Sequence, residues 1–304
     1  MKQIKQITVL SGKGGTGKTT LTAAFAALAK DAIVADCDVD APDLHMLLHP
    51  KIIERQEFKG SKLAVIDENK CIKCGLCREK CRFDAITEEL KVDPFSCEGC
   101  GVCAIVCPAN AITLTERISG HAYISKTRFG FMVHAMLKPG EANSGKLVTL
   151  VKQNAKMLAE KENIPLIIVD GPPGIGCPVI ASIANVDVGL VISEPTMSGI
   201  HDLKRVILLL RHFNIPPLVC INMYDINRDN AEKILNFCKE NNIEVAGKIP
   251  FNRKVIEAMT NGKTIIEYSP ESNVAKEVRE IWRKICNVLD MAGNRRRGQN
   301  RWGS

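Results

Sequence analysis

The sequence lacks any hydrophobic run long enough to cross a membrane. Apolar stretches such as residues 166–169 and 188–192 are far shorter than the roughly 18 to 20 residues that span a bilayer. The first ten residues also lack the apolar core and the small-residue cleavage site of an export signal. We therefore expect a cytoplasmic protein without a membrane span.

The composition lacks extremes as well. Of the 304 residues, 45% are hydrophobic and 25% are charged, which excludes a disordered or fibrous chain and favours an ordinary globular protein. The length allows two cores, or one large core with an insertion. The net charge of +7 is partly due to arginines in residues 292–304, a segment with nothing to pack. We expect this tail to be disordered and solvated, with no specific nucleic-acid partner and no membrane binding.

Cysteine, in contrast, is abundant. Thirteen cysteines in a chain without an export signal are not expected to form disulfides, because the cytosol keeps thiols reduced, so they indicate metal or redox chemistry. Eight of them lie in two seventeen-residue segments, 71–87 and 97–113, that repeat with an offset of 26 positions. This clustering marks residues 58–117 as a separate module inserted into the rest of the chain.

Strands alternate with helices outside the insertion. Short apolar runs predict strands at 4–10, 32–35, 166–169, 188–192, 218–221 and 245–249. Helical patterns lie between them, at 21–30, 145–162, 200–213, 228–241 and 274–291. This alternation predicts an α/β domain formed by residues 1–57 and 118–304, with a mostly parallel sheet and helices on both faces.

A phosphate-binding motif follows the first predicted strand. Residues 12–19 fit the pattern G-x-x-x-x-G-K-[ST] and stand between a strand and a helix, which is the context that the motif requires. Its glycines allow backbone N–H groups to turn toward phosphate oxygens, and the helix N-terminus adds its dipole. Lys18 is expected to hold the β and γ phosphates, and Thr19 to bind Mg²⁺. A glycine turn without a ligand is the alternative, which the motif and its context together disfavour.

Each repeat of the insertion carries four cysteines with the spacing C-x₂-C-x₂-C-x₃-C. In this spacing three thiolates bind one [4Fe–4S] cubane and the fourth reaches another, so two clusters are predicted. Structural zinc is the alternative, but zinc favours two C-x₂-C pairs per site rather than a run of four cysteines. Pro108 follows the last cysteine of the second repeat, whereas Arg82 stands at the same place in the first. Because the residue at this position is not a ligand, the replacement of proline by Arg82 affects the rigidity of the loop or the reduction potential of the cluster rather than cluster binding.

These motifs make the insertion resemble a bacterial-type two-cluster ferredoxin, which is a small α+β fold. The resemblance assigns one cluster to Cys71, Cys74, Cys77 and Cys107. It assigns the other to Cys97, Cys100, Cys103 and Cys81. Cys37 and Cys177 lie near the expected nucleotide site, and we interpret them as small buried residues rather than ligands.

Outside the insertion, the segment Lys13-Gly14-Gly15-Thr16-Gly17-Lys18-Thr19-Thr20 resembles the deviant Walker A P-loop ATPases of the MinD/ParA type. That superfamily also includes Mrp-type iron–sulfur cluster carriers and the nitrogenase iron protein. The resemblance implies nucleotide contacts along Gly12–Thr20. It also implies a dimer, of two identical chains or of two paralogues, that encloses two ATP molecules. In such a dimer Lys13 reaches the phosphates of the opposite subunit.

The same resemblance assigns roles to polar residues that follow other strands. Asp38 positions the attacking water, and Asp36 assists beside Mg²⁺. Asp170 binds Mg²⁺ through water and precedes Gly174, which responds to the γ-phosphate. Asn222 and Pro250 contact adenine, with Phe251 beside them. The expected catalytic residues are therefore Lys13, Lys18 and Asp38, and the expected Mg²⁺ ligands are Thr19, Asp36 and Asp170. Capping and turn roles are the alternatives for the acidic and amide residues.

A MinD-type ATPase with such an insertion is similar to the MinD-superfamily ATPases with an inserted ferredoxin domain, and segments 174–178 and 194–202 share this similarity. Three functions follow as alternatives. In the first, Mg²⁺-dependent ATP hydrolysis gates electron transfer through two clusters toward an unidentified redox or metallocofactor client. In the second, the protein assembles or carries clusters, although ferredoxin spacing implies tightly held ones. In the third, it is a spatial organiser whose helix 274–291 binds a surface, but such a stripe more often packs on the core. We expect the first.

Overall fold

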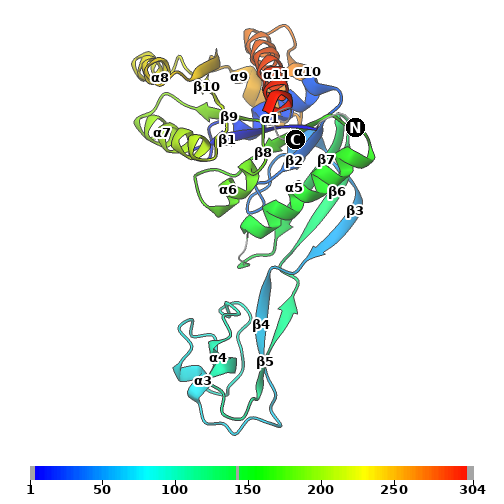
Figure 1. Cartoon of the computed structure of the whole chain (residues 1–304), viewed down its shortest axis with the longest axis vertical. Helices are drawn as coiled ribbons and strands as arrows, with labels where there is room; N and C mark the ends of the chain where they lie inside the picture. The colour runs from blue at the N-terminus through cyan, green and yellow to red at the C-terminus, as the bar shows by residue number, and fades with distance from the viewer. Residues whose placement is uncertain (1–3, 142–143, 300–304) are drawn as a thin grey trace.

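A nine-stranded sheet organises most of the molecule. The computed structural model describes residues 4–141 and 144–299, with side chains described as far as Asp290 (Figure 1). The strand order in the larger sheet is β11-β10-β9-β1-β8-β2-β7-β6-β3. The strands from β11 to β7 pair in parallel, and β6 is antiparallel to both neighbours. Their bounds are β1 Lys5–Ser11, β2 Ile33–Asp36, β3 Lys51–Phe58, β6 Gly120–Thr127, β7 Gly130–Leu137, β8 Leu166–Asp170, β9 Val188–Ser193, β10 Pro217–Asn222 and β11 Glu244–Ile249.

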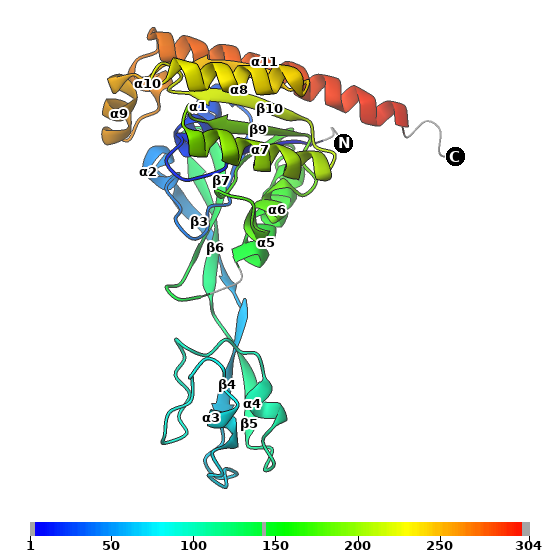
Figure 2. The same ribbon diagram turned by 90° about the vertical axis from the view of Figure 1, so that its left-hand side faces the viewer.

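Helices cover both faces of this sheet (Figures 1 and 2). One face packs against α1 and α11, where the ring of Phe25 stacks on Trp282 at 5.4 Å. The other face packs against α5, α6, α7 and α8. The helices are α1 Lys18–Ala29, α2 His45–Leu48, α5 Ser144–Lys161, α6 Cys177–Ile183, α7 Met197–His212, α8 Arg228–Glu240, α9 Arg253–Thr260, α10 Ile265–Tyr268 and α11 Asn273–Gln299. The strands and helices predicted from periodicity are therefore confirmed, within a few residues at their ends.

The C-terminal helix differs from expectation beyond residue 291. α11 continues to Gln299, where the sequence predicted a disordered tail from residue 292; residues 300–304 lie outside the described part of the chain. Arginine and glutamine are good helix formers, and the packed first half of α11 supplies the nucleus from which the helix extends. Val278, Ile281 and Ile285 of α11 are fully buried against the sheet, so this apolar stripe packs on the protein's own core. No helix in the described residues is long and apolar enough to cross a membrane.

Periodicity did not predict the strands β3, β6 and β7. Seven of the eight residues of β3 are exposed, so this edge strand carries no apolar alternation to detect. β6 and β7 mix buried small residues with histidine, lysine and threonine. These three strands extend the parallel sheet with an antiparallel edge, and the inserted segment leaves the body between β3 and β6.

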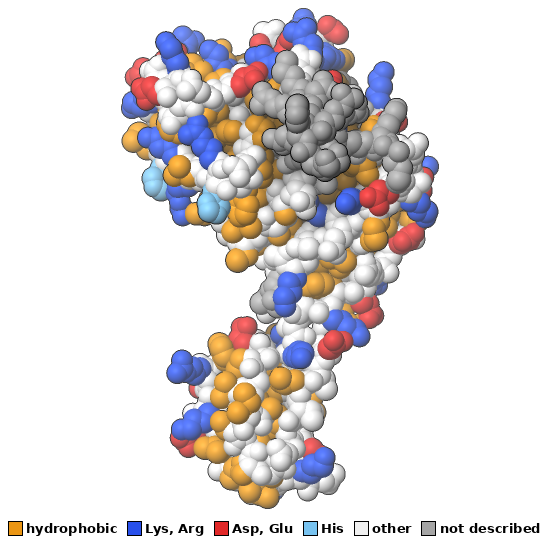
Figure 3. Space-filling view, in the orientation of Figure 1, with side chains coloured by type: hydrophobic (Ala, Val, Ile, Leu, Met, Phe, Trp, Pro, Cys, Tyr) orange, Lys and Arg blue, Asp and Glu red, His pale blue; other side chains and the backbone are white. Residues whose placement is uncertain are grey.

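The inserted segment stands at the end of a two-stranded arm, away from the nine-stranded sheet (Figures 1 and 2). The arm pairs β4 (Ser61–Ile66) with β5 (Ile112–Arg117) in an antiparallel register. Two short helices lie beside it, α3 (Leu76–Glu79) and α4 (Val102–Ile105). Figure 3 shows that this segment joins the body through a narrow neck.

The sequence repeat of the insertion is also a repeat of backbone conformation. Residues 26 positions apart share positive φ angles: 54° and 65° at Lys73 and Gly99, and 73° and 81° at Gly75 and Gly101. The pair Asp84 and Asn110 follows the same rule at 49° and 50°. Glycine, asparagine and aspartate are the residues that adopt this left-handed region most readily. The two halves of the insertion therefore have the same local fold.

Candidate functional site

A cleft of about 770 Å³ opens at the carboxyl ends of the parallel strands. Ligands of α/β proteins bind at this edge of the sheet, and the volume suits a nucleotide. The cleft brings together most residues that the sequence predicted for nucleotide binding: Gly14, Gly15, Thr16, Gly17, Lys18, Thr19, Thr20, Asp38, Asn222, Pro250 and Phe251. Gly12 is not among the residues that line the cleft; it packs so closely on Asp202 that an added Cβ would meet the Cβ of Asp202 at 2.2 Å.

The phosphate loop is held in a conformation that requires glycine. Gly15 and Gly17 have φ angles of 79° and 87°, a region that other residues adopt only with strain. A Cβ on Gly17 would also lie 2.5 Å from the amide nitrogen of Asn222. That nitrogen donates a hydrogen bond of 2.9 Å to the Thr16 carbonyl, so Asn222 at the end of β10 supports the loop directly.

The Lys18 ammonium is held in the cleft by Asp170, at the end of β8. The two side chains form an ion pair of 3.0 Å, and both are buried. Asp170 also accepts hydrogen bonds from the hydroxyls of Thr19 at 2.8 Å and Thr22 at 2.9 Å. Burial alone would lower the pKa of Lys18, but the charges of Asp170, Asp38 and Asp36 raise it above its ordinary value. Lys18 therefore places a positive charge where the sequence predicted phosphates.

Two further carboxylates lie at the carboxyl end of β2: Asp36 is its last residue, and Asp38 follows it. Asp36 is buried, and its Oδ1 accepts a hydrogen bond of 3.1 Å from the Asp38 amide, while its Oδ2 has no hydrogen-bond partner. Burial and the charge of Asp170 raise the pKa of Asp36 well above its usual range. Burial also raises the pKa of Asp38, which lies 4.0 Å from the Lys18 Nζ. A buried carboxylate oxygen without a donor is costly, and a bound divalent cation would satisfy it. Asp36, Asp170 and Thr19 thus fit the predicted Mg²⁺ site.

Lys13 points away from its own cleft. Its Nζ pairs with the Glu194 carboxylate, which follows β9, and donates to the Ser198 hydroxyl at 3.0 Å and the Thr196 hydroxyl at 3.4 Å. Thr196 caps α7 by accepting from the Gly199 amide at 3.0 Å. Sequence reasoning did not foresee this contact, although Glu194 directly follows a strand that ends at the same edge of the sheet as β1. Lys13 and Lys18 therefore occupy different surroundings in one chain.

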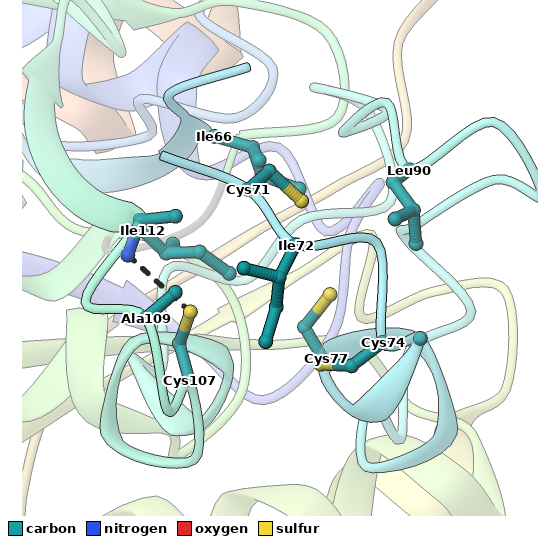
Figure 4. Close-up of a pocket in the computed structure, with 11 residues that line it drawn as sticks. Ile66, Cys71, Ile72, Cys74, Cys77, Leu90, Cys107, Ala109 and Ile112 are labelled. Carbon is teal, nitrogen blue, oxygen red and sulfur yellow. Dashed lines mark hydrogen bonds between the residues drawn. The ribbon is translucent and has the colours of Figure 1, made fainter. Parts of the chain in front are cut away.

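The eight clustered cysteines line two separate hollows in the insertion. One hollow is formed by Cys71, Cys74, Cys77 and Cys107, with the side chains of Ile66, Ile72, Leu90 and Ile112 (Figure 4). The other is formed by Cys81, Cys97, Cys100 and Cys103, with Ala64, Ile86 and Val92 in its wall. In each hollow one cysteine comes from the opposite repeat. This is the division that the ferredoxin resemblance implied.

The fit of these hollows to iron–sulfur clusters rests on the donor chemistry and the walls. Thiolates are the ligands of [4Fe–4S] clusters, and the Ala111 amide donates a hydrogen bond of 3.3 Å to the Cys107 sulfur. Within the described residues, no three cysteine, histidine or acidic side chains converge closely enough to hold a single metal ion. The eight cysteines instead line the two hollows described above.

Cys37 and Cys177 differ from each other. Cys37 directly follows β2 and is buried in the core between the sheet and α5, and burial raises the pKa of its thiol. Cys177 is exposed at the start of α6, in contrast to the prediction that both are buried, because the loop after Asp170 turns out to solvent before the helix begins.

The loop after Asp170 also contacts the phosphate loop. Gly174 in this loop donates its amide to the carbonyl of Ser11, at the start of the phosphate loop, at 3.0 Å.

The strand order, the glycine loop and the paired Lys18 and Asp170 define the class of protein, a nucleotide-binding α/β protein with a P-loop. Residues 7–265 match the CobQ/CobB/MinD/ParA nucleotide-binding domain family. The chain belongs to this family, whose MinD/ParA members are P-loop ATPases.

Individual relatives agree with this placement. An uncharacterised protein of Methanocaldococcus jannaschii is 35% identical over 289 residues, which cover 94% of this chain and 98% of the relative. An iron–sulfur cluster carrier protein of Pyrococcus abyssi is 22% identical over 96% of this chain and 89% of its own length. The solved structure of the septum site-determining protein MinD of Pyrococcus horikoshii, complexed with Mg-ADP, has a TM-score of 0.60. It shares 15% identity over 95% of this chain and 99% of that chain, a likeness that shows the fold alone.

Proposed function

We propose that this protein is a Mg²⁺-dependent ATPase that couples its nucleotide state to electron transfer through two [4Fe–4S] clusters. The observation that carries the proposal is the division of eight cysteines into two four-cysteine hollows, on the same chain as a cleft built for nucleotide phosphates. The inserted segment is, in this proposal, a ferredoxin-like domain comprising residues 58–117.

The nucleotide half of the proposal assigns one task to each charged group. The amides of the phosphate loop and the Lys18 ammonium bind the β and γ phosphates. Thr19, Asp36 and Asp170 would hold Mg²⁺, which would supply positive charge beside the phosphates and beside Asp170. Asp38 borders the cleft beside Lys18 and orients the attacking water. The Asn222 side chain oxygen and Pro250 contact the adenine.

The Lys13 contact makes hydrolysis depend on assembly. In the single chain, Glu194, Thr196 and Ser198 hold the Lys13 Nζ. A lysine held there adds no charge to the phosphates of its own cleft. Two chains, identical or paralogous, that face each other across two ATP molecules would let each Lys13 leave Glu194 and stabilise the charge of the partner's transition state.

The cluster half concerns the thiolates and their surroundings. The clusters, when bound, supply one-electron chemistry. The chain holds them with four thiolates each, excludes water with the isoleucine and leucine walls, and directs at least one amide hydrogen bond to a ligand sulfur. Charge, hydrogen bonds and exposure are the features by which a protein sets cluster potential.

A second candidate function is the assembly or delivery of clusters. It is favoured by the similarity to the iron–sulfur cluster carrier protein of Pyrococcus abyssi. Delivery requires labile ligation, whereas a hollow closed by cysteines from both repeats implies tight retention. We therefore place cluster delivery second.

The decisive experiment uses protein purified without oxygen. The proposal predicts about eight iron and eight sulfide per chain by the ferredoxin assignment, a visible absorption band near that of [4Fe–4S] proteins, and a midpoint potential that shifts when a non-hydrolysable ATP analogue binds. Transfer of iron and sulfide to an apo-ferredoxin on addition of ATP would favour delivery instead. Colourless protein that binds zinc would overturn both candidates. Nucleotide-dependent binding to lipid vesicles, with no change in potential, would favour a spatial organiser.

A further inference from the structure

The two cysteine sets lie at different distances from the nucleotide-binding body. β4 begins at Ser61, three residues after β3 of the body ends, and ends at Ile66, so Ser61 is at the body end of the arm and Ile66 at the other end. The hollow of Cys71, Cys74, Cys77 and Cys107 is lined by Ile66, and the hollow of Cys81, Cys97, Cys100 and Cys103 by Ala64. A Cβ on Gly99, between two cysteines of the second set, would meet the Lys62 carbonyl. We call Cys71, Cys74, Cys77 and Cys107 the distal set, and Cys81, Cys97, Cys100 and Cys103 the proximal set.

The repeat allows a residue-by-residue comparison of the loops that lead into each set. In both repeats an aspartate, Asp67 or Asp93, accepts from the amide two residues later through its side chain. Its carbonyl accepts from the first cysteine, Cys71 at 3.0 Å or Cys97 at 3.1 Å. The two loops therefore share these two bonds. They differ at the residue before the first cysteine: Ser96 donates its amide and hydroxyl to the Asp93 carboxylate, whereas Lys70 forms an ion pair of 3.4 Å with Asp67. A contact that one loop has and the other lacks is not required for the loop fold.

Arg117 supplies such a contact to the proximal loop. Its guanidinium donates to the carbonyl of Pro94, three residues before Cys97. Lys91, which occupies the corresponding position in the first repeat, is exposed to solvent. The proximal loop is therefore fastened by a side chain that has no equivalent in the distal loop.

Arg117 is itself fastened to the body. Its Nε lies 3.0 Å from the Glu141 carboxylate and 2.9 Å from the Ser61 hydroxyl, and Ser61 donates to Glu141 at 2.8 Å. Both members of the ion pair are largely buried, with side chains 18% and 10% exposed. Buried, multiply bonded pairs of this kind are geometrically specific. The segment that contains Glu141 follows β7, which is part of the larger sheet.

The same segment bonds to the chain beside Asp38, which lines the nucleotide cleft. Leu137, at the end of β7, donates its amide to the Val39 carbonyl at 3.2 Å, and Val39 directly follows Asp38. The next residue, Lys138, donates its amide to the Ser119 carbonyl at the base of the arm at 2.9 Å. Residues 137–141 therefore bond to the Asp38 segment at one end and to the arm at the other.

We propose that Arg117, held by Glu141, is a positioning residue for the proximal set, and that nucleotide binding beside Asp38 acts through it on the Cys97 loop and not on the Cys71 loop. The proposal rests on the proposed function, because it assumes that Asp38 responds to nucleotide and that the cysteines bind clusters. It adds which of the two clusters is affected, and through which side chains.

The test compares Glu141→Gln with Glu116→Gln in the full chain. Glu116 is the adjacent carboxylate on β5, exposed and paired only with Lys59 at 3.5 Å, so it is a matched control. Hydrogen exchange is measured with and without a non-hydrolysable ATP analogue. In the parent protein and in Glu116→Gln, the analogue should change amide exchange at residues 95–97 several-fold and leave residues 69–71 unchanged. In Glu141→Gln the change at 95–97 should be lost.

A redox titration gives a second readout. Loss of the Glu141 negative charge leaves Arg117 uncompensated near the proximal set, so the midpoint potential of one cluster should rise while the other stays constant. Arg117→Lys keeps the charge but loses the three-way bonding, and should lose the exchange response without the same rise. Equal nucleotide responses at both loops, no response in the parent protein, or an intact response in Glu141→Gln would each overturn the inference. If one of these outcomes is found in protein that still contains clusters and hydrolyses ATP, the proposed function stands. Protein that lacks clusters or ATPase activity would refute the proposed function itself.

Discussion

The nucleotide cleft and the inserted segment are built in opposite ways. In the cleft, Lys18, Thr19 and Thr22 satisfy Asp170 before any ligand is present, and large apolar clusters support the strands beneath. In the insertion the buried core is Ala64, Cys77, Ala85, Ile86, Cys97 and Ile112, of which two are predicted cluster ligands. Short segments with so small a core need a disulfide or a metal to stay folded. One site is therefore preformed, whereas under the proposed function the fold of the other depends on the clusters that it would bind.

Removal of the clusters should produce the largest effect. When iron is chelated under non-denaturing conditions, we expect residues 61–117 to lose hydrogen-exchange protection and to become accessible to protease. The reason is that their core consists partly of the predicted cluster-ligand cysteines. The nucleotide cleft should still bind an ATP analogue with unchanged affinity. If the insertion and the nucleotide cleft lost their exchange protection together, the contrast between the two sites would be contradicted.

Replacement of Lys18 should affect only the preformed site. Lys18→Ala removes the cation that faces the phosphates, and we expect the ATPase rate to fall by about 10²–10³-fold or more. The iron content and visible spectrum should remain those of the parent protein. Lys156→Ala, which removes an exposed lysine of α5, is the control. Hydrolysis at the original rate in Lys18→Ala would refute the assignment of this site.

The body should also carry a pH dependence of its own. Burial lowers the pKa of His134 on β7 to about 4, and its ring bonds to the Ser125 hydroxyl at 2.9 Å. Between pH 6.5 and 4 the unfolded chain binds this proton and the folded chain does not, so stability is full above about pH 6.5 and falls as the pH is lowered. The loss is roughly 2–3 kcal/mol at pH 4.

Urea denaturation of the body at pH 4 to 7 measures this dependence. His134→Gln should remove that part of the slope, while His212→Gln, at an exposed histidine, should retain it. A slope that is equal in all three proteins would show that other groups govern acid stability.

The smallest effect is expected at Thr22, whose hydroxyl bonds to both the Lys18 carbonyl and Asp170. Thr22→Val leaves one buried bond of Asp170 unmade, which we expect to cost about 1–3 kcal/mol of unfolding free energy. Thr149→Val removes the same type of bond to the carbonyl four residues earlier, on an exposed helix face, and is the matched control. Thr22→Ser should restore most of the stability. Equal losses in the two valine variants would mean that the Asp170 bond contributes nothing.

Much of this architecture is encoded locally and was predictable. The buried parallel strands have continuous apolar sequences, and the glycine motif, Asp36, Asp170 and Asn222 each follow such a strand, so that one sheet edge gathers them. The cysteine spacing likewise carries the two-hollow arrangement. Helix spacing could also have indicated Thr22, which lies four residues after Lys18 on the same face of α1.

Other features depend on contacts between distant segments. The pairing of Lys13 with Glu194 joins residues 181 positions apart, and the Arg117 and Glu141 pair joins an inserted strand to a loop after β7. Local pattern carries no information on such partners. β3 was missed because an exposed edge strand lacks alternation, and its partner β6 lies on the far side of the insertion.

Because the arm of β4 and β5 is long and thin, a small rotation at its base displaces its far end by several ångströms. β4 and β5 pair over six positions, which at about 3.3 Å per residue makes a lever of roughly 20 Å. A tilt of about 10° at its base would carry the far end sideways by about 3 Å, on the same strand spacing. In a symmetrical pair of chains the two tips would move relative to each other by up to twice that amount. Fluorescent labels near the tips would report such a swing as a change in energy transfer.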